Sequence, residues 1–187
     1  VPAPRGEVPR PAIMFVHGGG WAAARQEDLL PPALQFARVG LVCFSVDYRL
    51  VKPGRINIHP AQIDDVQLAM RWIREHADEF GADPKRLAAW GDSAGGHLVA
   101  LLATTDTRDT SAPLQHHSSR AACVVDLYGP TDLTADFPTS GPFGISVQKL
   151  VDDLLGKPAK SVPEIAREAS PFFRADATAM PVLVIQG

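Results

Sequence analysis

The sequence is short of cysteine, of aromatic residues and of long apolar runs. Two of its 187 residues are cysteine, and 7% are aromatic. Two cysteines cannot build the dense disulfide framework of small secreted domains, and neither lies in the Cys/His spacing of a structural zinc site. No apolar run approaches the roughly 20 residues needed to cross a bilayer. We therefore expect no disulfide scaffold, no metal site and no membrane span in this sequence.

Positive and negative charges are nearly balanced. The sequence has 18 Lys and Arg against 21 Asp and Glu, for a net charge of −3, and no basic cluster stands out. Nucleic acids and anionic membranes are therefore not expected as partners. Hydrophobic residues make up 45% and charged residues 21%, as in globular domains, and the length suits one sizeable core. We expect a single domain over residues 1–187.

Short apolar runs alternate with helical patterns along the chain. Five runs read as strands, at 12–16, 41–46, 87–90, 121–127 and 181–186. Apolar residues recur at helical spacing between them, over 27–39, 60–80 and 94–104. Strands that are apolar on both faces and separated by helices predict an α/β fold with a parallel sheet covered on both sides.

Two features of this pattern carry further expectations. Cys43 and Cys123 both fall in strand runs, so we expect two buried thiols. The segment 131–179 is long and rich in proline and glycine, with weak helical patterns. Because long insertions near the carboxyl ends of parallel strands often shape binding sites, we expect a cap-like insertion there.

A G-x-S-x-G motif, Gly91-Asp92-Ser93-Ala94-Gly95, lies where the apolar run at 87–90 ends and the helical pattern at 94–104 begins. A strand that turns sharply into a helix leaves no room for side chains two positions before and after the serine, which explains the two glycines. The serine hydroxyl is then exposed at the top of the sheet, at a helix N-terminus that favours a developing anion. Ser93 is therefore the candidate nucleophile.

A second motif, His17-Gly18-Gly19-Gly20-Trp21, follows the first strand run. Three glycines allow backbone amides to turn toward one point, as the tetrahedral oxyanion of acyl transfer requires. Such a loop supplies donors together with the residue after the nucleophile, here Ala94. A phosphate-binding loop is the alternative, but the G-x-x-x-x-G-K-S pattern is missing. His17 is interpreted as a brace for the loop.

The two motifs and their surroundings resemble the α/β-hydrolase superfamily. The resemblance is greatest to the carboxylesterases grouped with bifunctional feruloyl and acetyl-xylan esterases, near the hormone-sensitive lipase family. Beyond HGGGW, it rests on DYRL at 47–50, the stretch 59–105 that contains GDSAGG, YGPTDL at 128–133, EASP at 168–171 and PVLVIQG at 181–187.

The resemblance implies a three-layer α/β-hydrolase fold with a mostly parallel sheet, incomplete at both ends, and no cofactor. It implies Ser93 as nucleophile and the backbone amides of Gly19, Gly20 and Ala94 as the oxyanion hole, with Gly18 as a further candidate. Trp21 is expected to line the acyl pocket. The implied substrate is a small-molecule or carbohydrate ester. Asp132 and the residues of DYRL are expected to be structural.

Histidine is absent after His117, although the triad of this fold runs in the order serine, acid, histidine. His97 lies one helical turn after Ser93 and is expected to pack over the turn, while His116 and His117 fall in a polar segment. We therefore expect a fragment of a larger hydrolase that lacks the triad acid and histidine and is catalytically feeble alone. Its last strand, at 182–186, is expected to be an exposed apolar edge.

The leading interpretation is a serine carboxylesterase for small acetyl- or feruloyl-like esters. Two alternatives stay open. One is amide hydrolysis of the aryl formamidase or peptidase type, because related HGG-W sequences include such enzymes. The other is a noncatalytic protein of hydrolase fold that binds a small molecule.

Overall fold

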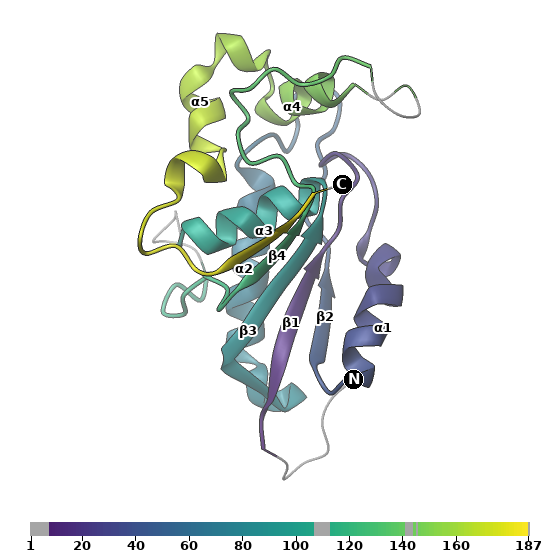
Figure 1. Ribbon diagram of the computed structural model, residues 1–187, viewed down its shortest axis with the longest axis vertical. Helices are drawn as coiled ribbons and strands as arrows, with labels where there is room; N and C mark the ends of the chain where they lie inside the picture. The colour runs from purple at the N-terminus through teal and green to yellow at the C-terminus, as the bar shows by residue number, and fades with distance from the viewer. Residues whose placement is uncertain (1–7, 107–112, 141–143, 145, 187) are drawn as a thin grey trace.

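A computed structural model describes residues 8–106, 113–140, 144 and 146–186. Five strands form one sheet in the order β2-β1-β3-β4-β5, and every described strand pair is parallel (Figure 1). The strands are β1 (Arg10–Val16), β2 (Val42–Val46), β3 (Ala82–Asp92), β4 (Val124–Leu127) and β5 (Val182–Ile185). The predicted parallel α/β architecture is confirmed.

Helices connect the strands as the periodicity predicts, with shifted ends. The α-helices are α1 (Leu30–Arg38), α2 (Ala61–Glu75), α3 (Ala94–Thr104), α4 (Val147–Leu155) and α5 (Pro163–Glu168). The short 3-10 helices are η1 (Gln26–Leu29), η2 (Ala77–Phe80), η4 (Ala159–Ser161) and η5 (Pro171–Arg174). The helix expected to reach residue 80 changes to 3-10 geometry after Glu75 and stops at Gly81, whose φ of 64° suits glycine.

The two faces of the sheet bury different parts of the core. Along β1, Met14 and Val16 pack into the main cluster with residues of α2 and α3, whereas Ile13 and Phe15 pack with α1. This alternation follows from the two-residue period of a strand. Helices therefore cover both faces of the central strands, which gives the three layers.

The prediction of two buried thiols is wrong for Cys123 and is met only in part by Cys43. Cys43 is half-buried beside α1, but Cys123 is exposed. It directly precedes β4, where Val124 and Asp126 face α3, so alternation turns the Cys123 side chain to the opposite face. Its exposure shows that this part of that face is not covered by the described helices.

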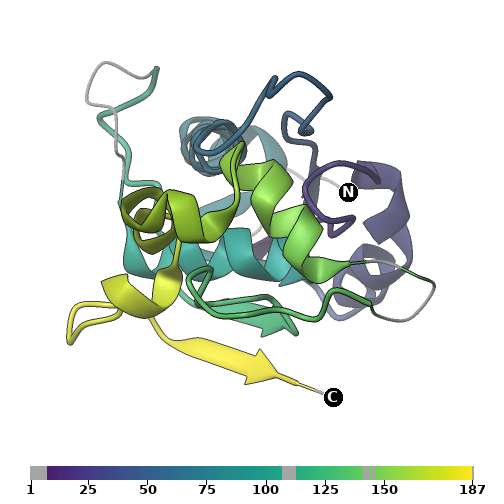
Figure 2. The same cartoon turned by 90° about the horizontal axis from the view of Figure 1, so that it is seen from above.

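The last strand is an exposed apolar edge, as expected. The four residues of β5 pair with β4 on one side only and are 41–56% exposed. Figure 2 shows β5 at the outer edge of the molecule. None of the helices in the described residues is long and apolar enough to span a membrane.

Between β4 and β5, helices α4 and α5 lie beyond the carboxyl ends of the strands, above the sheet in Figure 1. This segment contacts the loops that follow the strands: a Cβ added to Gly20 would meet Leu150 of α4 at 2.7 Å. The helices of this segment therefore border the region that contains the two glycine motifs.

Candidate active site

Ser93 occupies a sharp turn between β3 and α3. Its φ of 51° and ψ of −116° are strained for a residue with a side chain. The turn depends on close backbone approach, because a Cβ on Gly91 would collide with Gly95, and one on Gly95 would collide with the Val16 carbonyl. Ser93 is half-buried, and within the described residues its hydroxyl makes no hydrogen bond.

The glycine motif after β1 forms a tight loop beside this turn. Gly19 and Gly20 have φ values of 85° and 58°, which glycine adopts without strain. The Gly18 amide donates to Asp92 Oδ1 at 3.1 Å, so it is not free to bind a substrate oxygen. The amides of Gly19 and Gly20 donate to no group among the described residues. The Ala94 amide is in the first turn of α3, where amides lack helical partners.

Tyr48 and His17 hold the start of the glycine loop in place. The Tyr48 hydroxyl donates to the carbonyls of His17 and Gly18 at 3.0 and 2.9 Å. The His17 ring stacks on Tyr48 with centroids 4.3 Å apart and is 1% exposed. Nearby, Arg49 pairs with Asp65 at 2.8 Å. These contacts agree with the structural roles expected for His17 and for the DYRL residues.

Asp92 links the two motifs through its side chain. Burial raises the pKa of its carboxyl above the ordinary value, while the hydrogen bond from Gly18 and the nearby His17 oppose the shift. Its carboxylate leaves no room for a side chain at Gly18, where an added Cβ would meet Oδ2 at 2.6 Å. Asp92 therefore fixes the distance between the glycine loop and the serine turn.

His97 is fully buried on α3 and cannot act as the base for Ser93 in this arrangement. Its Nδ1 accepts a hydrogen bond from Trp21 Nε1 at 3.2 Å, and its Nε2 lies 2.7 Å from the Ala169 carbonyl. These partners fix a neutral ring with the proton on Nε2. Burial lowers the pKa of His97 to about 4, so the ring stays neutral at pH 7.

The side chain of Trp21 lies in a different environment from the one expected. Its indole is 2% exposed and is part of the core that includes α3, so it offers almost no surface to a ligand in this chain. The polar NH of a buried indole needs an acceptor, and His97 supplies it. The residue expected to line the acyl pocket instead connects the glycine loop to α3.

The model of the BD-FAE family matches residues 2–187. The chain belongs to the BD-FAE family. It is 34% identical over 183 residues to the esterase LipC of Mycobacterium tuberculosis, which covers 96% of this chain and 44% of that protein. It is 42% identical over 105 residues to the carboxylesterase NlhH of the same species, covering 55% of this chain and 31% of the relative.

Solved structures match the same BD-FAE chain over most of its length. An acetyl ester-xyloside bifunctional hydrolase from Caldicellulosiruptor lactoaceticus gives a TM-score of 0.77 at 27% identity, covering 94% of this chain and 60% of that one. The thermophilic esterase Est2 of Thermogutta terrifontis gives 0.74 at 26% identity, covering 97% and 62%. The α/β-hydrolase fold is thereby established. The chain spans less than half the length of the curated relatives named above.

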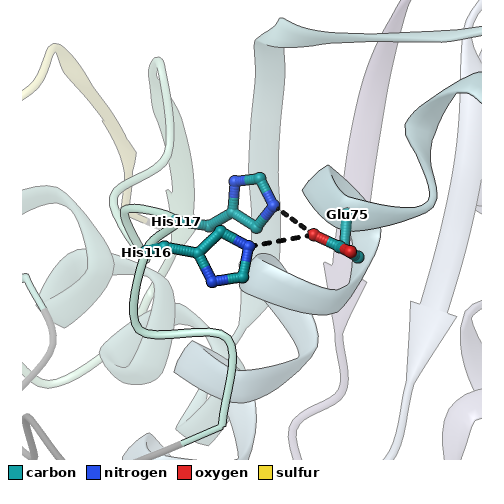
Figure 3. A group of neighbouring side chains, drawn as sticks. All are labelled: Glu75, His116 and His117. Carbon is teal, nitrogen blue, oxygen red and sulfur yellow. Dashed lines mark hydrogen bonds and ion pairs between the residues drawn. The ribbon is translucent and has the colours of Figure 1, made fainter.

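The positions of two groups in this BD-FAE chain were not predicted from the sequence. Tyr128 follows β4, next to Leu127, whose carbonyl accepts from the Ser93 amide at 2.8 Å. It is 51% exposed with a φ of 47°, a strained conformation that could have been inferred only from the fold. The second group is His116 and His117, which meet Glu75 instead of the serine turn (Figure 3).

Proposed function

We propose that Ser93 is the nucleophile of a serine carboxylesterase that acts on small acyl esters. The observation that carries the proposal is the strained, half-buried Ser93, with an unbonded hydroxyl, on the turn that Asp92 ties to the glycine loop. This combination supplies a nucleophile and free amide donors in one region. The esterase names of the relatives support the same reaction class.

In the proposed reaction, Ser93 Oγ attacks the ester carbonyl carbon while a base takes the hydroxyl proton. The amides of Gly19, Gly20 and Ala94 donate to the tetrahedral oxyanion. Collapse of the intermediate expels the alcohol, which receives the proton, and leaves an acyl-serine. Water then attacks the acyl-serine and releases the acid.

We propose that the base, and the acid that orients it, are residues other than those described above. His97 uses both ring nitrogens in other hydrogen bonds, and His116 and His117 contact Glu75. Asp132 is committed to a local turn, where it accepts from the amide and hydroxyl of Thr134 at 2.9 and 2.6 Å. The greater length of the relatives is consistent with further catalytic residues.

We propose acetyl and similarly small acyl groups, including those on carbohydrates, as the substrates. The name of the Caldicellulosiruptor relative, an acetyl ester-xyloside hydrolase, supports this class. The exposed Tyr128 is the candidate for contact with the acyl or sugar group, because it extends the strand next to Ser93. Trp21 is proposed to position the glycine loop.

Hydrolysis of p-nitrophenyl acetate by a form of the protein that carries the proposed base and acid, and by its Ser93→Ala variant, tests the proposal. We expect kcat to fall on the order of 10⁴- to 10⁶-fold in the variant, as for other serine nucleophiles. Ser161→Ala is the matched control, because its exposed hydroxyl bonds only the local Pro158 carbonyl. An unchanged rate in Ser93→Ala would refute the role. Comparison with a formyl anilide separates ester from amide hydrolysis.

A further inference from the structure

Three side chains with metal-binding atoms converge away from the serine turn. Glu75 ends α2, and His116 and His117 belong to the segment before β4 (Figure 3). Glu75 Oε2 lies 3.1 Å from His116 Nε2 and 2.6 Å from His117 Nε2. The potential ligand atoms of all three residues lie within 4.8 Å of one another.

The spacing of these atoms is close to that of a metal site. Zinc binds imidazole nitrogen and carboxylate oxygen at about 2.0–2.2 Å, which places tetrahedral ligand atoms about 3.3–3.6 Å apart. The nitrogen–oxygen separation of 3.1 Å to His116 therefore needs to widen by a few tenths of an ångström, and that of 2.6 Å to His117 by roughly 0.7–1.0 Å. Two imidazoles and one carboxylate are also the ligand set of known zinc sites that keep a fourth position open.

The segment that contains the two histidines is held against α2 without the help of a metal. Arg74, next to Glu75, donates to the carbonyls of Ser118 and Arg120. Asp106 accepts from the hydroxyls of Ser118 and Ser119 at 2.8 and 2.9 Å. The end of α2 and the backbone that follows His117 are thus positioned before a ligand arrives, which lowers the entropy lost on binding.

Without a metal, two neutral rings that carry their protons on Nε2 can both donate to Glu75 Oε2, because a carboxylate oxygen can accept two hydrogen bonds. A divalent cation instead satisfies both neutral rings and the carboxylate at once. The ligand types, imidazole nitrogen with carboxylate oxygen, suit Zn²⁺ better than Mg²⁺ or Ca²⁺, which prefer oxygen ligands alone.

We propose that Glu75, His116 and His117 form a surface site for a divalent transition metal ion such as Zn²⁺. Each ring holds its proton on Nδ1 and coordinates through Nε2, Glu75 coordinates through its carboxylate, and water takes the remaining position. The ion joins the end of α2 to the segment before β4. Since it binds the folded state, it stabilises that state and has no part in the chemistry of Ser93.

Isothermal titration of the tag-free protein with ZnCl₂ tests the site, and the absorption of bound Co²⁺ reports its geometry. We expect one ion per chain. His117→Ala and Glu75→Gln should each weaken binding about 100-fold or more, because even loss of an outer-shell partner costs 10- to 100-fold. His76→Ala is the matched control, since this imidazole adjoins Glu75 but contacts Trp72. The zinc affinity of the His76→Ala variant should equal that of the unchanged protein.

Thermal unfolding provides a second readout. Zinc should raise the melting temperature of the unchanged protein and of His76→Ala, and should not raise it in His117→Ala or Glu75→Gln. Far-ultraviolet circular dichroism without metal confirms that the variants are folded, and the near-isosteric Glu75→Gln protects the test against a folding defect in the histidine variant. Equal zinc affinity in all four proteins, or no binding at millimolar zinc, would overturn the proposal.

Discussion

The indole Nε1 of Trp21 donates a 3.2 Å hydrogen bond to Nδ1 of His97. The other nitrogen of that ring lies 2.7 Å from the Ala169 carbonyl. Three segments distant in sequence therefore meet at one buried imidazole: the glycine loop, α3 and the end of α5. This bridge holds the loop against the helix that begins at Ser93, and it explains why neither aromatic ring is available for substrate.

Removing the indole NH should destabilise the protein. In Trp21→Phe, the buried Nδ1 of His97 loses its donor, and an unsatisfied buried acceptor costs about 1–3 kcal/mol. Urea denaturation should report that loss in the free energy of unfolding. Trp72→Phe, at a side chain that is 43% exposed, should change it by only about 0.5 kcal/mol. Equal effects of the two substitutions would contradict the bridge.

The same histidine predicts a pH dependence of stability. Its pKa is lowered from 6.5 to about 4, so the unfolded chain binds more protons between these values. Stability should therefore be fully present above pH 6.5 and fall as the pH drops toward 4, by up to about 3 kcal/mol. Burial raises the pKa of Asp92 and Asp126, which contributes the opposite slope as their carboxyls ionise.

Comparison with His97→Gln isolates the histidine contribution. The two carboxyls titrate in both proteins, whereas the glutamine does not titrate. Urea denaturation at pH 4.5 and 7 should show a smaller loss of stability in the variant than in the unchanged protein. The same loss in both proteins would show that His97 is not held neutral by the fold.

Asp92 should act as a positioning residue for the glycine loop. Asp92→Ala removes the acceptor of the Gly18 amide, and the loop should shift. Because a displacement of about 1 Å can cost 100-fold in rate, kcat for p-nitrophenyl acetate should fall about that much. Asp92→Asn keeps an acceptor oxygen and should restore most of the activity. If asparagine and alanine are equally impaired, the carboxylate charge, and not loop position, is what matters.

Gly95 should tolerate no side chain. A Cβ there would collide with the carbonyl of Val16 in β1, and backbone cannot move aside cheaply. Gly95→Ala should lower the free energy of unfolding by about 3 kcal/mol or more. Gly40 has a φ of 97° but open space around it, so Gly40→Ala should cost only the conformational strain of about 1–2 kcal/mol. Similar losses at both positions, measured by urea denaturation, would count against the close approach.

Local patterns made the fold and the serine turn predictable. Strand alternation, helical spacing and the glycines around Ser93 are all properties of a few adjacent residues. Details that depend on distant partners were out of reach. The Gly18 amide is occupied by a carboxylate 74 positions away, and Glu75 meets His116 after 41 positions. Nothing in the sequence near either partner specifies these pairings.

Burial was the weakest part of the prediction. Cys123 was expected in the core because its run is apolar, yet alternation turns it to a part of the opposite face that none of the described helices covers. Trp21 was expected at a pocket because it follows the glycine loop, yet its NH finds a partner in the interior. Composition predicts that a residue can be buried, but the neighbouring elements decide which side of the sheet is covered.

Covalent labelling by diethyl p-nitrophenyl phosphate tests the assignment of the nucleophile most directly. The reagent transfers a diethylphosphoryl group to an activated serine and releases p-nitrophenol, and peptide mass spectrometry locates the adduct. In protein that carries the proposed base and acid, we predict one diethylphosphoryl group per chain, on Ser93, and parallel loss of p-nitrophenyl acetate hydrolysis. An adduct on another residue, or hydrolysis that persists in protein labelled at Ser93, would contradict the account.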